Sequence, residues 1–267
     1  MGAILGAHGY RQGEMLGVRE NKRTFSKRSL HGQLAHAIGL RIVAGEIAEG
    51  EVLPTEESAS SDLSVSRTSY REAIKVLTAK GLVESRPKVG TRVKPRSEWN
   101  MLDPDVVLWA AELEPTSSFA EALFEFRLII EPAAARLAAE KAIPEHLGSI
   151  RTAMADMAAT EPATRANVDA DLAFHSAILH ASGNELLSSL SHVVETLLER
   201  SFVISSRGPG VRAASIPLHQ SVCDHIADGK AQEAENAMVV LLTMARNDID
   251  QILQSTETDN LQTRGES

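Results

Sequence analysis

Residues 65–71, Val-Ser-Arg-Thr-Ser-Tyr-Arg, predict the start of a helix that presents two arginines, Arg67 and Arg71, about one turn apart. Ser66 is placed to cap this helix, because its hydroxyl can accept a hydrogen bond from an unpaired backbone N–H of the first turn. Apolar residues then recur with helical spacing and define one buried face: Tyr70, Ala73, Ile74 and Leu77. The arginines therefore project from the opposite face near a positive helix N-terminus, which suits DNA phosphate or a guanine edge, as in a recognition helix.

The flanking residues complete a module of three helices and a hairpin over residues 28–96. Apolar residues at every fourth position predict a first helix over 30–42, and Thr55 begins a short second helix. Gly81 ends the recognition helix. Two short alternating strands follow, at 82–86 and 91–94, joined by a turn at 87–90. This order predicts a winged helix-turn-helix.

The charge of the chain is divided between its two halves. The total is −9, but residues 21–96 carry +6 and residues 97–267 carry −15. A basic module joined to an acidic one suggests that only the first meets nucleic acid, although a chance surface asymmetry would give the same totals. The single cysteine, Cys223, excludes an internal disulfide. No apolar run is long enough to span a membrane, and we expect a cytoplasmic protein.

The rest of the chain is predicted to be helical, so the fold class is mostly α. Residues 97–116 read as a linker with a first connecting helix, and 117–254 as an all-helical bundle broken at proline and glycine. Within it, helices are expected at 117–140, 144–159, 164–182, 184–206, 215–228 and 231–254. The polar ends, 1–27 and 255–267, are expected to be a disordered arm and tail.

Two groups of polar residues stand out in the second module. Asp171 and His175 are four apart on one predicted helix and share a face, and His219 follows on a later helix. A carboxylate and two imidazoles can hold a divalent metal, although an Asp–His pair on a helix surface is more common than a metal site. Arg127 lies in an otherwise apolar helical stretch and requires an anion, either a structural carboxylate or the carboxylate of a ligand.

The first module resembles the GntR family of bacterial repressors. The resemblance covers about residues 28–94 and is carried by Leu53-Pro54-Thr55-Glu56, Val65-Ser66-Arg67-Thr68, Arg71-Glu72-Ala73, Lys80-Gly81-Leu82-Val83 and Gly90-Thr91. It implies that Ser66, Arg67, Thr68 and Arg71 contact DNA and that Gly90 lies at the tip of a wing in the minor groove. Glu57 departs from the family, where a basic residue is usual, and would repel phosphate.

The second module resembles the all-helical FCD effector domain of the FadR-type branch. The similar segments are Phe126-Arg127 with Glu131-Pro132, Asp171-Leu172-Ala173-Phe174-His175, Ser182-Gly183-Asn184 and His219 with Asp228-Gly229. The resemblance implies an effector site of Arg127, Asp171, His175, Asn184 and His219, with Arg127 on the effector's carboxylate. It also implies a divalent metal, zinc or similar, on Asp171, His175 and His219.

The metal set is incomplete, because the position of the family's fourth ligand is Leu241. Two arrangements are equally compatible with the sequence. Either a metal is held by three residues with water or effector completing its shell, or these side chains bind the effector directly.

The stretch Trp99–Trp109 resembles the linker of a family member that represses a sugar-acid operon. It implies a sugar-acid effector such as D-galactonate or a related aldonate, unless the two tryptophans only fasten the domains together. The leading hypothesis is a metabolite-responsive repressor that binds double-stranded operator DNA as a homodimer, since one recognition helix reads only a few base pairs. The alternatives are a small metalloenzyme using Asp171, His175 and His219, and an architectural DNA-binding protein without an effector.

Overall fold

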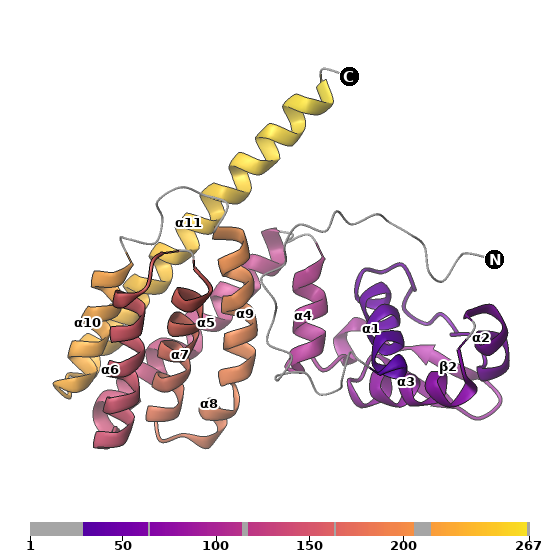
Figure 1. Cartoon of the computed structure of the whole chain (residues 1–267), viewed down its shortest axis with the longest axis horizontal. Helices are drawn as coiled ribbons and strands as arrows, with labels where there is room; N and C mark the ends of the chain where they lie inside the picture. The colour runs from indigo at the N-terminus through magenta and orange to yellow at the C-terminus, as the bar shows by residue number, and fades with distance from the viewer. Residues whose placement is uncertain (1–28, 64, 114–116, 163, 206–214, 266–267) are drawn as a thin grey trace. The chain divides into compact units, whose positions relative to one another are not determined.

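The structure, a computed structural model, describes residues 29–63, 65–113, 117–162, 164–205 and 215–265. The chain divides into two compact units, Met1–Leu113 and Glu114–Ser267. Both are drawn in Figure 1. The arm predicted for residues 1–27 lies outside the described residues.

The first unit has the predicted winged helix-turn-helix. Its elements are α1 (Leu30–Val43), α2 (Glu56–Leu63), α3 (Arg67–Ala79), β1 (Val83–Arg86), β2 (Gly90–Val93), a short 3₁₀ helix (Arg96–Glu98) and α4 (Pro104–Glu112). The predicted apolar face of α3 is buried, and its hydrophobic residues pack toward α1. The strands pair antiparallel, with Val83 opposite Val93, and Val52 bridges to Arg92. The wing is thereby tied to the segment between α1 and α2.

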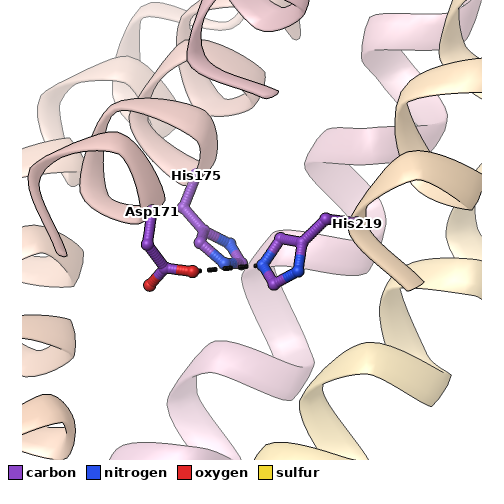
Figure 2. A group of neighbouring side chains, drawn as sticks. All are labelled: Asp171, His175 and His219. Atoms are coloured by element: carbon purple, nitrogen blue, oxygen red, sulfur yellow. Dashed lines mark ion pairs between the residues drawn. The ribbon is translucent and has the colours of Figure 1, made fainter. Parts of the chain in front are cut away.

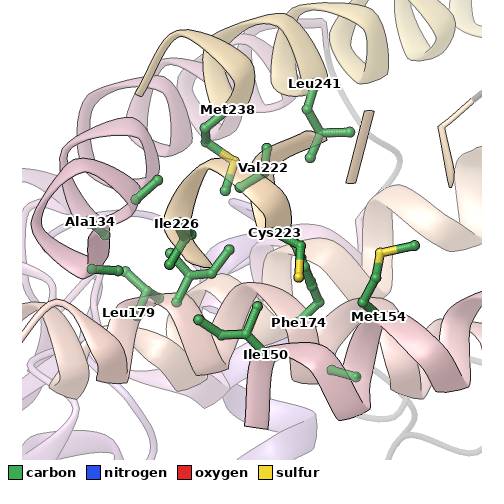
Figure 3. Close-up of a cluster of buried hydrophobic side chains, with 14 of the residues drawn as sticks. Ala134, Ile150, Met154, Phe174, Leu179, Val222, Cys223, Ile226, Met238 and Leu241 are labelled. Carbon is green, nitrogen blue, oxygen red and sulfur yellow. The ribbon is translucent and has the colours of Figure 1, made fainter. Parts of the chain in front are cut away.

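In the residues of the second unit that the structure describes, the regular elements are all helices. They are α5 (Ser117–Lys141), α6 (Pro144–Ala159), α7 (Arg165–Ala181), α8 (Glu185–Ser189), α9 (Ser191–Ser205), α10 (Ile216–Ala227) and α11 (Ala231–Gly265). Helix α5 packs against α7, α10 and α11, and α6 packs against α7. Figure 3 shows their shared core, in which Phe174, Leu179, Val222, Ile226 and Met238 are buried. The prediction of a mostly α fold with a helical bundle is confirmed.

Two helix boundaries differ from the sequence prediction. The helix expected over 184–206 is divided at Leu190 into α8 and α9. The hydroxyls of Ser188 and Ser189 donate to the carbonyls of Asn184 and Leu186, and such bonds back to the preceding turn compete with the helical ladder. The last helix was expected to end near residue 254, but α11 continues to Gly265 because no glycine or proline interrupts it earlier.

Residues 97–113, the described part of the segment predicted as a linker, are a folded part of the first unit. Trp99 donates from Nε1 to the carbonyl of Lys94, and Trp109 is fully buried against α1. Both tryptophans are therefore fastened within this unit. Among the described residues, no helix is long and apolar enough to cross a membrane.

Candidate functional site

The start of α3 has the capped, arginine-bearing geometry predicted from the sequence. The Ser66 hydroxyl accepts from the backbone N–H of Ser69 at 3.0 Å, which confirms the cap. Arg67 and Arg71 are exposed, and each contacts a glutamate at the start of α2. Arg67 lies 3.4 Å from Glu57, and Arg71 lies 3.2 Å from Glu56. Exposed ion pairs of this kind contribute at most about 1 kcal/mol, so DNA can displace them.

The wing stands beside α3 and carries the other predicted contact residue. Gly90 has φ of +96° and begins β2, while Lys88 in the same turn has φ of +64°. A groove runs between the two elements; it is lined from α3 by Arg71, Lys75 and Thr78, and from the wing by Lys88, Gly90 and Thr91. Thr68 is exposed on the first turn of α3. The groove thus gathers three basic side chains, Arg71, Lys75 and Lys88, together with Glu56.

In the second unit, Arg127 has a structural carboxylate as its partner. Its Nε lies 2.6 Å from Oε1 of Glu131, one turn further along α5, and both side chains are almost fully buried. The other oxygen of Glu131 lies 2.6 Å from Nδ1 of His175 on α7. Burial raises the pKa of Glu131, but Arg127 and His175 together outweigh it and hold that pKa at about 2. Glu131 is therefore a carboxylate shared by two of the predicted site residues.

Asp171, His175 and His219 converge as predicted, with their candidate ligand atoms all within 4.8 Å of one another. Figure 2 shows Asp171 and His175 on one helix facing His219 on another. Nδ1 of His219 lies 2.8 Å from the carbonyl oxygen of Ser215, and its Nε2 lies 3.1 Å from Oδ1 of Asp171. Both imidazoles thus have an acceptor beside Nδ1, which favours the tautomer with a bare Nε2.

This donor set fits a divalent cation. A bare Nε2 and a carboxylate oxygen 3.1 Å apart repel each other unless a proton or a cation lies between them. Two imidazoles and one carboxylate are ligands that zinc and similar metals accept. The residues fit equally well around the hydroxyl groups of a ligand.

The polar cluster lines a cavity of about 80 Å³. Its polar lining includes Arg127, Asp171, His175 and His219, together with Ser215. The rest of the wall is mostly apolar and comes from Phe124, Leu198, Leu241, Leu242, Met244, Ala245 and Ile249. Leu241 is buried in this wall, so it supplies packing where a fourth metal ligand was expected.

One predicted effector residue is placed elsewhere. Asn184 is exposed, does not line the cavity, and caps α8 by accepting from the backbone N–H groups of Leu186 and Leu187. Asparagine is a favoured helix cap, and the residue after Gly183 is where the next helix starts. Its assignment to the effector site is thus not supported by its position.

Sequence reasoning missed two residues of the site. Glu131 was visible as the carboxylate one helical turn after Arg127, at the spacing of an ion pair. Asp248 lines the cavity from α11, and burial raises its pKa. It gave no signal, because acidic residues are frequent in this half of the chain.

Comparison with known protein families matches residues 30–93 to the bacterial regulatory proteins of the gntR family. Residues 122–244, which include most of the residues that line the cavity, match the FCD domain. A relative in Escherichia coli, the uncharacterized HTH-type transcriptional regulator YieP, is 33% identical over 81% of this chain and 94% of its own length. The chain belongs to the GntR family. It is a DNA-binding transcriptional regulator with an FCD domain.

Other members of the family align over nearly their whole length. The galactonate operon transcriptional repressor of Escherichia coli is 31% identical over 80% of this chain and 94% of its own. The HTH-type transcriptional regulator LutR of Bacillus subtilis is 32% identical over 82% of this chain and 98% of its own length. A solved regulator, Lar of Listeria monocytogenes, shares the fold with a TM-score of 0.58 and 18% identity, covering 84% of this chain and 97% of its own. These relatives are regulators, so the GntR protein described here is not an enzyme.

Proposed function

We propose that this GntR regulator is a repressor that binds its operator as a homodimer and releases it when a small carboxylate enters the FCD cavity. The observation that carries this proposal is that Arg127, Asp171, His175 and His219 all line that cavity. The domain that precedes the cavity in the chain is the DNA-binding one. Because a repressor must reach its operator, we propose a cytoplasmic location.

The effector we propose is a hydroxy acid such as D-galactonate or a related aldonate. Support comes from the similarity to the galactonate operon repressor. Nε of Arg127 donates to Glu131. We therefore propose that the two terminal nitrogens of the guanidinium group donate to the effector carboxylate. Asp171, His175 and His219 suit the hydroxyl groups.

A divalent metal is the second part of the proposal. Asp171, His175 and His219 would hold it, and the metal would supply positive charge that attracts the carboxylate or a hydroxyl of the effector. Leu241 leaves the protein with three ligands, so we expect weaker retention than with four. With or without a metal, the effector contacts side chains of α5, α7 and α10 at the same time. Effector binding therefore favours the packing geometry of these three helices that has the highest affinity for the effector.

The experiment compares Arg127→Lys with the wild type in thermal-shift titrations with D-galactonate and shorter hydroxy acids. Lysine keeps a positive charge beside Glu131 but removes the planar fork that pairs with carboxylates. Arg136→Lys is the matched control, because Arg136 also pairs with a glutamate one turn along α5 but is exposed. We expect Arg127→Lys to weaken binding at least tenfold and Arg136→Lys to leave it unchanged. Equal effector affinities for the two variants would mean that the effector carboxylate does not bind to Arg127.

A further inference from the structure

The C-terminal end of the recognition helix is held by a buried group of charges. Lys80 is the C-cap of α3, and its side chain is only 3% exposed. Its ammonium nitrogen lies 2.6 Å from Oδ2 of Asp105, and 2.8 and 3.1 Å from the two oxygens of Asp103. Both aspartates belong to the start of α4, outside the winged helix itself. We call Lys80, Asp103 and Asp105 the α3–α4 clamp.

Helix α4 is itself fixed at both ends. Asp103 is its N-cap and accepts from the backbone N–H groups of Asp105 and Val106. Further along, Trp109 donates from Nε1 to Nδ1 of His36 on α1 at 2.6 Å. The Trp109 ring lies so close to Gly39 that a Cβ there would meet it at 2.4 Å. Helix α4 therefore has one defined packing position against α1 and the end of α3.

The clamp fixes the direction of α3 in a way that apolar packing does not. Burial of the apolar face holds α3 on the core, but hydrophobic contacts have little directionality. Three charge-assisted hydrogen bonds to one ammonium group are directional, and they act at one end of a 13-residue helix whose other end carries Arg67 and Arg71. A rigid helix tilts as a whole, so a shift at Lys80 moves both arginines relative to DNA.

Stability alone does not account for a buried lysine with two aspartates. Replacing a buried ion pair by apolar side chains of similar size is often neutral or stabilising, because the charges must lose their hydration. A buried charge group is better suited to fixing one geometry among several of similar energy. The geometry of the α3–α4 clamp therefore points to a role in operator recognition.

We propose that Lys80 and Asp105 are positioning residues for operator recognition, through which α4 sets the angle of the recognition helix. They touch no DNA in this account; they act on Arg67 and Arg71 through the body of α3. Helix α4 is the last helix of the first unit, so this positioning acts entirely within the DNA-binding unit.

The test uses the double variant Lys80→Met/Asp105→Leu, which removes one positive and one negative charge and leaves Asp103 as the cap of α4. Fluorescence anisotropy measures binding to the operator and to a scrambled duplex, at a temperature where circular dichroism shows the variant folded. We expect operator affinity to fall at least about tenfold, the loss of one well-formed base contact, with affinity for the scrambled duplex unchanged. The control, Arg41→Gln/Glu46→Gln, removes an exposed pair of equal charge from the same unit and should alter neither affinity.

Two results would overturn the proposal. One is a folded double variant that discriminates operator from scrambled DNA as the wild type does. The other is an equal loss on both duplexes, which would indicate general damage to the unit. Should the double variant fail to fold, Asp105→Asn replaces it, since Lys80 keeps its contact with Asp103. A several-fold loss confined to the operator supports the proposal, and unchanged discrimination refutes it.

Discussion

Replacing Glu131 by alanine tests whether the centre of the FCD domain depends on the shared carboxylate. Glu131 is 1% exposed, and its two oxygens each lie 2.6 Å from a cationic or imidazole nitrogen, on Arg127 and His175. Removing it leaves the guanidinium of Arg127 buried without its counter-charge. Breaking a buried ion pair in this way costs about 3–5 kcal/mol of unfolding free energy.

Urea denaturation followed by circular dichroism measures the loss. With a urea dependence of about 2 kcal/mol per M, a loss of that size lowers the midpoint by about 1.5–2.5 M for the transition that reports the FCD domain. Glu140→Ala is the matched control, because Glu140 pairs with Arg136 at the same spacing on the same helix but in an exposed position. Its midpoint should fall by less than about 0.5 M. Equal midpoint shifts for the two variants would refute the view that Glu131 is the counter-charge that a buried Arg127 requires.

Three further outcomes follow from the geometry. Arg67→Ala or Arg71→Ala should weaken operator binding by about 1–3 kcal/mol in gel-shift titrations, and wild-type affinity for both would contradict their assignment to base contacts. Leu241→His should let the protein retain a divalent metal through dialysis better than the wild type; elemental analysis that finds stoichiometric metal in chelator-treated wild type would contradict the three-ligand site. Asn184→Ala should lower stability by about 1 kcal/mol as the loss of a helix cap, yet keep the wild-type response to D-galactonate, and a lost response would return Asn184 to the effector site.

Local signals made most of the DNA-binding unit predictable. The cap at Ser66, the apolar spacing after it and the glycine at 81 each act within a few residues, so they are readable without a tertiary structure. The sequence could not show that Lys80, at the end of this helix, is buried and donates hydrogen bonds to two aspartates more than 20 residues later in the chain. Such partners are brought together by the packing of α4, which no local pattern specifies.

The effector site was predictable in part for a similar reason. Asp171 and His175 share one helix, so their common face follows from the spacing, whereas the position of His219 depends on how α10 packs. The sequence placed Asn184 just after a glycine, where a helix cap is favoured, and its side chain does cap the first turn of α8. Asp248 came from a helix with many other acidic residues and carried no distinguishing pattern.

The central claim is that a small carboxylate in the FCD cavity changes the affinity of this regulator for its operator. The most direct measurement is a fluorescence anisotropy titration of the wild-type protein on operator DNA, with and without saturating D-galactonate. Coupling between two such sites is commonly about 1–3 kcal/mol, so we expect the ligand to weaken operator binding about 5–150-fold. Operator affinity that is identical with and without every aldonate and shorter hydroxy acid tested would contradict the claim.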